Sequence, residues 1–119
     1  MLNSFLGRRL LGCKYAISGA IQLIKNEASI QVQTAIAIGI TIAGIVFKIT
    51  ATEWMLQCFA IGLVLTAEGL NTAAEEIVNF IHPSQHPKIG YIKDVAAGAV
   101  FFAAITAIVI AGIIYIPKF

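Results

Sequence analysis

Apolar residues gather along the chain in three long runs. The longest run without a charged residue, Val95–Ile116, has 22 residues. A helix of that length crosses the hydrocarbon core of a membrane, which is about 30 Å thick. The second run is Ala28–Phe47, and the third is Trp54–Ala67, whose helical pattern continues through Glu68 to about Phe80. The pattern predicts three transmembrane helices, over about 30–48, 54–80 and 92–116.

Two polar segments separate these runs. The short segment Lys48–Glu53 is typical of a turn between two antiparallel helices. The segment Ile81–Lys93 contains Pro83, Pro87 and Gly90. Proline lacks a backbone donor and clashes inside a helix, so we expect a break in the helix there.

The N-terminal residues 1–27 show helical spacing rather than the features of a signal peptide. No continuous apolar stretch is followed by an A-x-A-like cleavage site. One side of the predicted helix is an apolar stripe, made of Leu6, Leu10, Cys13, Ile17, Ala20, Ile21 and Ile24. The other side carries Lys14, Ser18, Gln22 and Lys25. This pattern predicts an amphipathic helix lying in the membrane interface, and a short helix packed only on protein is the alternative.

The composition supports a membrane protein. Hydrophobic residues make up 59% of the 119 residues and charged residues 12%, against roughly 45–50% and about 25% in soluble domains. Too few charges remain to cover a soluble enzyme, and a net charge of +2 is too small for a nucleic-acid binder. Cys13 and Cys58 lie in different apolar segments, so we expect reduced packing residues. We predict an all-α integral membrane protein, with residues 1–119 forming one membrane domain.

Basic residues are distributed unequally between the two predicted sides of the membrane. Six of them lie before the first span or in the loop after the second: Arg8, Arg9, Lys14, Lys25, Lys88 and Lys93. Only Lys48 and Lys118 fall on the other side. Because cytoplasmic loops are enriched in Lys and Arg, we expect the N-terminus and the 81–93 loop of this multi-pass protein in the cytoplasm.

The second span carries a polar stripe toward its cytoplasmic end. At 100° per residue, five polar side chains share one face: Glu68, Asn71, Thr72, Glu75 and Asn79. Glu68 and Glu75 lie two turns apart, roughly 10 Å along the axis, whereas Glu76 points away from the stripe. These groups would lack partners in lipid, so they must face other helices or a water-filled site.

Two carboxylates about two helical turns apart, as Glu68 and Glu75 are, favour the binding of a divalent cation. Oxygen ligands suit Mg²⁺, which often uses one or two carboxylates together with substrate phosphates. Glu27, Lys93 and Asp94 fall on the same side of the membrane, and Arg8 and Lys14 are further cations for phosphate oxygens. The charges therefore suggest a nucleotide–metal site facing a lipid. An interhelical hydrogen-bond seam is the alternative for the stripe.

Other kinds of site and protein are less well supported. His82 and His86 are four residues apart, a spacing that could bind zinc if both stood on one helix. The adjacent Pro83 and Pro87 argue against a helix there, so we do not expect a zinc site. The chain has no G-x-x-x-x-G-K-[ST] loop, no G-x-G-x-x-G and no protein-kinase motif. A small transporter or channel subunit that couples protons or cations through a membrane Glu is the competing class. Such a protein would need its acidic residue near the midplane, and an assembly subunit would not need clustered acids at all.

The polar stripe and its surroundings resemble a known family. The stretch Glu68-x-Leu-Asn71-Thr72-Ala-x-Glu75, a Pro/His loop and Lys93-Asp94-Val-Ala-Ala-Gly-Ala-Val100 closely resemble prokaryotic diacylglycerol kinases. Asn26-Glu27-Ala and Lys14-Tyr15-Ala resemble the N-terminal part of the same family. The resemblance covers nearly the whole chain. It implies a lipid kinase of the bacterial plasma membrane that uses ATP and Mg²⁺. It also implies a homotrimer whose active sites are shared between neighbouring protomers.

The resemblance also implies roles for individual residues. Glu68 is expected to be the general base, and Asn71 to orient Glu68 or the substrate. Glu27 and Glu75 are the expected Mg²⁺ ligands. The implied nucleotide contacts are Arg8, Tyr15, Glu27, Glu75, His86, Lys93 and Asp94, with Lys93 on the phosphates. The implied substrate contacts are Arg8, Glu68 and Ala97.

Two positions depart from the family pattern, and the lipid acceptor stays open. Ala74 replaces a larger aliphatic residue, and Asn79 stands where the family generally has Asp, which removes one charge from the stripe. The family includes diacylglycerol and undecaprenol kinases, whose acceptors are both primary alcohols. The Lys-Tyr-Ala and Ala-Ala-Gly-Ala-Val stretches favour the undecaprenol branch slightly.

Overall fold

The computed structural model describes residues 4–119, which form four α-helices and a short 3₁₀ turn. The helices are α1 (Phe5–Asn26), α2 (Ala28–Phe47), α3 (Ala51–Ile81) and α4 (Pro87–Tyr115), followed by the turn Ile116–Lys118. Three of them are long and apolar enough to cross a membrane: α2, α3 and α4 with its terminal turn. The predicted all-α membrane architecture is therefore confirmed. Residues 1–3 of the predicted N-terminal helix lie outside the described part.

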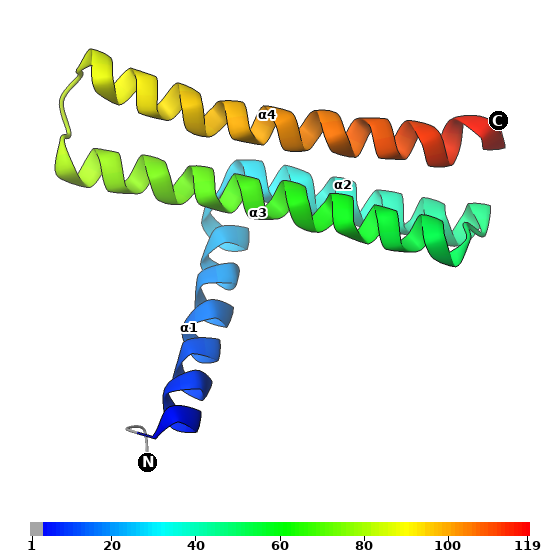
Figure 1. The fold of residues 1–119 in the computed structure, drawn as a ribbon, viewed down its shortest axis with the longest axis horizontal. Helices are drawn as coiled ribbons and strands as arrows, with labels where there is room; N and C mark the ends of the chain where they lie inside the picture. The colour runs from blue at the N-terminus through cyan, green and yellow to red at the C-terminus, as the bar shows by residue number, and fades with distance from the viewer. Residues whose placement is uncertain (1–3) are drawn as a thin grey trace.

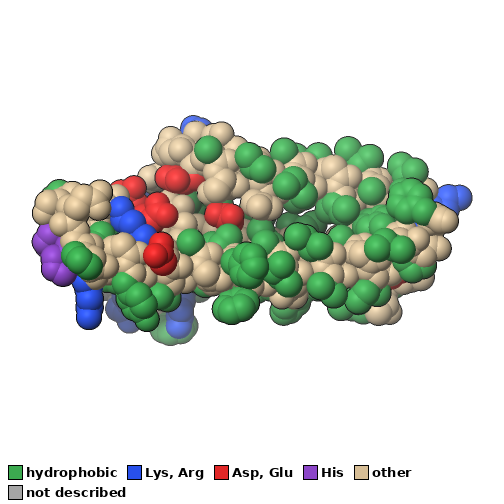
Figure 2. Space-filling view, turned by 90° about the horizontal axis from the view of Figure 1, so that it is seen from above, with side chains coloured by type: hydrophobic (Ala, Val, Ile, Leu, Met, Phe, Trp, Pro, Cys, Tyr) green, Lys and Arg blue, Asp and Glu red, His purple; other side chains and the backbone are tan. Residues whose placement is uncertain are grey.

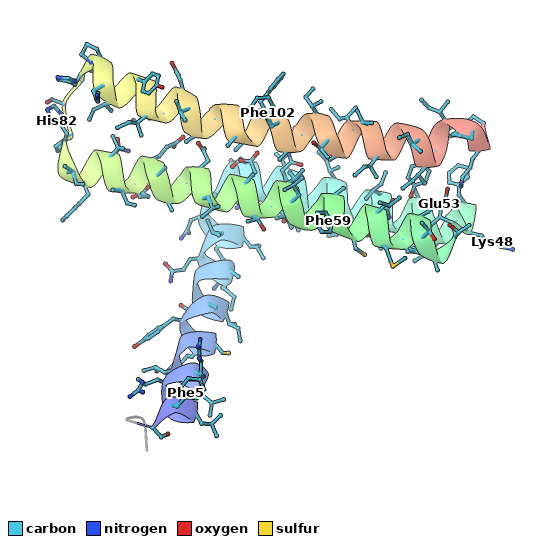
Figure 3. The ribbon with its side chains drawn as sticks, viewed as in Figure 1. Phe5, Lys48, Glu53, Phe59, His82 and Phe102 are labelled. Carbon is cyan, nitrogen blue, oxygen red and sulfur yellow. The ribbon has the colours of Figure 1, made fainter. Side chains whose placement is uncertain are left out.

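Helices α2, α3 and α4 run lengthwise beside one another, whereas α1 leaves the start of α2 and extends crosswise, away from the bundle (Figure 1). Helix α3 packs most extensively against α4. Large apolar side chains cover the outside, and Phe59 and Phe102 are both 73% exposed (Figure 3). Such a surface suits a bundle whose solvent is hydrocarbon. The apolar stripe of α1 is exposed as well, so this chain's own helices do not cover it.

Helices α1 and α2 meet at one extended residue, Glu27, which ends the first helix and precedes the second. Its backbone N–H donates to the Leu23 carbonyl. The side-chain amide of Gln31 donates to the Ile24 and Lys25 carbonyls, both at 3.0 Å. These bonds satisfy carbonyls that the end of α1 would otherwise leave open. The change of direction between the two helices is therefore fixed at Glu27.

The turn between α2 and α3 is shorter than predicted. A turn between these two antiparallel helices is confirmed, but it covers 48–50 rather than 48–53, because Thr50 and Glu53 form a capping box. The Thr50 hydroxyl accepts from the Glu53 N–H at 3.2 Å, and the Glu53 carboxylate accepts from the Thr50 N–H at 2.9 Å. Helix α3 therefore begins at Ala51. Lys48 ends α2 in the left-handed region, with φ 52°.

The loop between α3 and α4 is also shorter than predicted. The expected break in the helix is confirmed, but the loop covers 82–86 rather than 81–93, because α4 already begins at Pro87. Proline is well suited to a first helical turn, where its missing N–H needs no partner. The Nδ1 atom of His86 accepts from the Lys88 N–H at 3.0 Å and caps the helix. Lys93 and Asp94, which were expected at the start of the third span, consequently lie inside α4 rather than in its first turn.

At the end of the bundle opposite this loop, polar groups join all three long helices. The Tyr115 hydroxyl donates to Oε1 of Gln57 at 2.6 Å and lies 3.2 Å from the Ile40 carbonyl. The Gln57 amide donates to the same carbonyl at 3.2 Å. Lys118 and Glu53 form an ion pair at 3.0 Å nearby. We call Gln57, Tyr115, the Ile40 carbonyl, Lys118 and Glu53 the far-end network.

Close packing accompanies the far-end network. Gly44 of α2 lies directly against the indole of Trp54 on α3. A Cβ at position 44 would come within 2.7 Å of the Trp54 ring, so only glycine fits this approach. Ile49 and Ile114 are buried beside Tyr115. The far end is therefore held by both packing and hydrogen bonds.

Candidate active site

Glu68 belongs to the buried face of α3. The buried residues of this helix are Gln57, Ala60, Val64 and Glu68, spaced three or four residues apart and so on one face. Only 8% of Glu68 is exposed. Burying a carboxylate is costly unless it has a partner or a function. The position of Glu68 therefore matches the prediction that it faces the protein interior rather than lipid.

Asn71 and Glu75 continue the polar stripe toward the loop. The Asn71 amide nitrogen donates to Oε1 of Glu75 at 3.1 Å. The other amide atom, Oδ1, is buried and has no hydrogen-bond partner within residues 4–119. Such an acceptor normally costs about 1–3 kcal/mol, so a donor from outside this chain would stabilise it. The described part of the chain contains no hydrogen bond between Asn71 and Glu68.

Helix α4 supplies the opposite side of the site. Asn71 lines a groove of about 400 Å³ together with Ala96 and Ala99. Because α3 and α4 are antiparallel, moving one turn from Asn71 to Glu75 corresponds to moving one turn back along α4, to Lys93. Lys93 is half-buried and Asp94 is exposed. Acidic, basic and histidine side chains gather at this end of the bundle, whereas hydrophobic side chains predominate along the rest and a basic side chain marks the opposite end (Figure 2).

The junction of α1 and α2 brings Glu27 toward this end of α3. A methyl group of Leu23, one turn before Glu27, lies 3.3 Å from the position that a Cβ on Gly69 would occupy. Gly69 follows Glu68 directly, so the junction packs beside the buried carboxylate. Glu27 itself is half-buried. A Cβ at position 69 would require the Leu23 methyl group to shift slightly.

Other predicted site residues lie apart from this centre within one chain. Arg8 and Tyr15 stand on the part of α1 that extends away from the bundle, and Tyr15 is 66% exposed (Figure 1). Ala97 is exposed on α4. His86 lies at the loop, where its ring caps α4. One protomer thus places Glu68, Asn71 and Glu75 along one helix, with Lys93 of the neighbouring helix level with Glu75 and the Glu27 junction at their side, and leaves the residues of α1 outside.

The donor atoms at the site suit magnesium better than zinc. No group of three or more His, Cys, Asp or Glu side chains that could hold a metal occurs in the described chain. Carboxylates on Glu27 and Glu75 still fit Mg²⁺, which needs only one or two protein carboxylates when phosphates complete its shell. The rings of His82 and His86 lie 5.6 Å apart. The Nδ1 atom of each ring is already engaged, with Ser84 and with the Lys88 N–H respectively.

The sequence analysis missed Gln57 and Tyr115, which the far-end network joins across 58 positions. The signal was present, because Gln57 is a lone amide inside the apolar run Trp54–Ala67. An amide in a membrane helix usually bonds to a neighbouring helix. Which helix supplies the partner depends on packing, and one sequence does not contain that information.

Comparison with known proteins gives consistent matches. The family profile described as prokaryotic diacylglycerol kinase matches residues 14–115. The undecaprenol kinase of Bacillus subtilis (strain 168) is 34% identical over 104 residues, which cover 87% of this chain and 85% of that protein. The diacylglycerol kinase of Haemophilus influenzae is 30% identical over 103 residues, 86% of this chain and 87% of that protein. The diacylglycerol kinase of Synechocystis is 28% identical over 109 residues, which cover 91% of this chain and 62% of that protein.

Proposed function

The chain belongs to the prokaryotic diacylglycerol kinase family, whose members are lipid kinases, and we propose that it transfers the γ-phosphoryl group of ATP to the primary hydroxyl of a membrane lipid. The observation that carries this proposal is the buried Glu68, followed on the same helix by the hydrogen-bonded Asn71–Glu75 pair. Lys93 of the antiparallel helix α4 lies about level with Glu75 and supports the proposal. A carboxylate at the membrane boundary with phosphate-binding groups on its water side is the arrangement that this reaction needs.

Glu68 is the proposed general base. Its burial on the inner face of α3 puts its carboxylate where a lipid hydroxyl at the headgroup boundary can approach. The carboxylate takes the proton as the hydroxyl oxygen attacks the γ-phosphorus and the bond to the β-phosphate oxygen breaks. Proton removal by a positioned base contributes typically about 10²–10⁴-fold to a rate.

The remaining groups bind and orient the nucleotide. Phosphoryl transfer depends on positioning and charge neutralisation more than on covalent help. Lys93 would lie on the phosphates, and Glu27 and Glu75 would hold Mg²⁺, which supplies positive charge at the phosphate oxygens when bound. Asn71 fixes one oxygen of Glu75 at 3.1 Å, which limits the directions from which that carboxylate can bind.

The proposal includes a homotrimer with shared active sites. Arg8, Tyr15, His86, Asp94 and Ala97 are proposed contacts to nucleotide or substrate, yet α1 carries the first two away from Glu68 of the same chain (Figure 1). A neighbouring protomer would bring its α1 to this site. The exposed apolar stripe of α1 would then rest in the interface on the cytoplasmic leaflet.

We further propose that the N-terminus and the loop between α3 and α4 face the cytoplasm, since six basic residues lie on that side and two on the other. Thiol labelling tests this in a variant lacking Cys13 and Cys58, with Ser84→Cys and Thr52→Cys compared. A membrane-impermeant reagent should label position 52, and not 84, in intact cells of a bacterium with a single membrane. Labelling of position 84 from outside would refute the orientation.

The direct test of the proposed function is phosphate transfer. Purified protein is given ATP labelled at the γ-phosphate with diacylglycerol or undecaprenol, with and without Mg²⁺. We expect a labelled phospholipid only when Mg²⁺ is present. Undecaprenol is our preferred acceptor, because of the Lys-Tyr-Ala and Ala-Ala-Gly-Ala-Val stretches. If neither lipid is labelled, the proposed function is wrong.

A further inference from the structure

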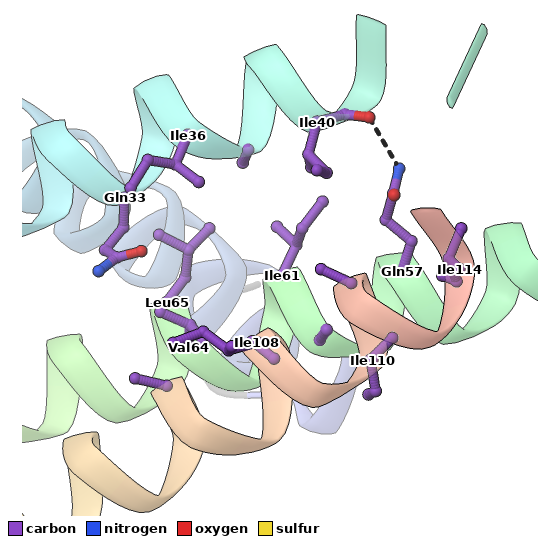
Figure 4. Close-up of a pocket in the computed structure, with 15 residues that line it drawn as sticks. Gln33, Ile36, Ile40, Gln57, Ile61, Val64, Leu65, Ile108, Ile110 and Ile114 are labelled. Atoms are coloured by element: carbon purple, nitrogen blue, oxygen red, sulfur yellow. Dashed lines mark hydrogen bonds between the residues drawn. The ribbon is translucent and has the colours of Figure 1, made fainter. Parts of the chain in front are cut away.

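A second cavity lies inside the bundle, among α2, α3 and α4. Its volume is about 250 Å³, and Figure 4 shows its walls. The side chains around it are almost all apolar, among them Ile36, Ala37, Ile61, Val64, Leu65 and Ile108. The polar exceptions are Gln33 and Gln57, from α2 and α3. Asn71 lines the other groove, but none of the residues that line this cavity has a role in the proposed reaction.

The cavity begins directly below the proposed base. Val64 lines it and lies one turn, about 6 Å, from Glu68 on the same buried face of α3. Along α3 the lining then continues from Leu65 to Gln57, about 12 Å at 1.5 Å per residue. A molecule whose polar end reaches Glu68 could therefore extend its other end into this space.

The size and polarity of the cavity indicate its occupant. A helix with its side chains is about 10–12 Å wide, so 250 Å³ would hold only a few ångströms of one. Water needs two to four polar partners, and apolar cavities stay dry. A hydrocarbon chain is narrow, needs no hydrogen bonds and is present in the surrounding bilayer. We propose that the cavity receives the hydrocarbon tail of the acceptor lipid while its hydroxyl lies at Glu68. This inference rests on the proposed lipid kinase function.

The two glutamines mark the two ends of the tail site. At the floor, the Gln57 side chain is fully engaged, since it donates to the Ile40 carbonyl and accepts from Tyr115. It therefore offers no free polar atom to a terminal methyl group. At the other end, Gln33 has no hydrogen-bond partner within the described residues, and its amide is free for the polar part of the lipid (Figure 4).

The tail site acts by positioning rather than by affinity. The bilayer is as apolar as the cavity, so transfer of a tail between them has no hydrophobic driving force. A tail held in the cavity instead fixes the hydroxyl beside Glu68, and a displacement of about 1 Å at a reacting group can cost about 100-fold in rate. Blocking the cavity should therefore lower kcat/KM for long-chain acceptors and leave the KM for ATP unchanged.

A matched pair of substitutions on α2 tests this inference. Ala37 lines the cavity, whereas Ala35 is exposed and does not. Ala37→Leu should lower kcat/KM for dioleoylglycerol at least about tenfold, and hardly change it for dihexanoylglycerol, whose tails are too short to need the cavity. Undecaprenol and farnesol form the equivalent pair for a prenol kinase. Ala35→Leu should leave both values as in the wild type.

A photolabel adds a readout that needs no turnover. An acceptor with a diazirine at the end of its tail should label peptides containing 57–65 or 104–114 in the wild type, and label them less in Ala37→Leu. An unchanged ratio of long-chain to short-chain activity, or equal loss on both acceptors, would overturn the tail site. A change in oligomer size without a change in acceptor preference would also overturn it, by indicating a contact between copies. Wild-type protein inactive on every acceptor would instead contradict the proposed function.

Discussion

The two ends of the helical bundle use polar groups in opposite ways. At the far end, Gln57, Tyr115, Glu53 and Lys118 all have partners within the chain. At the loop end, Asn71 leaves a buried oxygen unpaired, and Glu68 is buried without a hydrogen-bond partner among residues 4–119. Both ends place polar side chains inside an apolar bundle, so polarity alone does not distinguish them.

The difference lies in what completes each set of hydrogen bonds. A buried group whose partners come from its own chain holds helices together, and it needs nothing else. A buried group without a partner costs stability unless a ligand supplies one. We therefore interpret the far-end network as structural and the Glu68–Asn71–Glu75 stripe as the place where lipid and nucleotide bind.

The largest expected effect comes from removing the proposed base. Glu68→Gln keeps the shape of the side chain and should lower kcat by about 10²–10⁴-fold, with little change in the KM for ATP. Steady-state kinetics of lipid phosphorylation measure both values. Glu76→Gln is the control, because Glu76 is exposed and points off the stripe. A near-normal kcat for Glu68→Gln would contradict the proposed base and indicate a structural role for Glu68.

The proposed metal ligands should give the next largest effect. Glu27→Gln and Glu75→Gln each remove a negative oxygen donor, so each should raise the Mg²⁺ concentration needed for half-maximal rate by about 100-fold, the upper end of the range for residues around a metal. Titration of activity with Mg²⁺ measures this, and cross-linking checks that the variants keep the oligomeric state of the wild type, which we propose to be a trimer. An unchanged Mg²⁺ dependence in both variants would contradict the proposal that Glu27 and Glu75 bind Mg²⁺.

Asn71 offers a finer test, because the resemblance and the structure suggest different partners for it. The structure pairs its amide with Glu75, so Asn71→Ala should raise the Mg²⁺ requirement by about 10–100-fold, as losing the partner of a metal ligand does. A lower kcat at unchanged Mg²⁺ requirement would show instead that Asn71 acts through Glu68 or the lipid.

The smallest effect on activity is expected at the far end. Tyr115→Phe deprives Gln57 of a donor at 2.6 Å and should destabilise the protein by about 1 kcal/mol, within the range for hydrogen bonds between membrane helices, with kcat within about twofold. Unfolding in a denaturing detergent measures the loss. Tyr91→Phe, an exposed tyrosine on the same helix, should not alter stability. A large loss of kcat in Tyr115→Phe would contradict the separation of the two ends.

The sequence allowed the spans and the polar stripe to be predicted because both follow from periodicity. Runs such as Val95–Ile116 need only length and hydropathy. The helix starts were predicted less well, because the Thr50–Glu53 capping box and Pro87 extend α3 and α4 into segments that looked like loops. The pairing of Gln57 with Tyr115 and the cavity beside Ala37 depend on how helices pack, and no local pattern contains that information.

Hydrogen exchange on the intact protein in bilayers tests the contrast between the two ends most directly. Exchange would be followed by mass spectrometry with and without ATP and Mg²⁺, since a bound ligand slows the local opening that exposes amides. We predict slower exchange in peptides covering 71–93 at the loop end, and unchanged exchange in peptides covering 51–57 and 111–118. Protection at the far end, or none in 71–93 under conditions where the lipid is phosphorylated, would contradict the account.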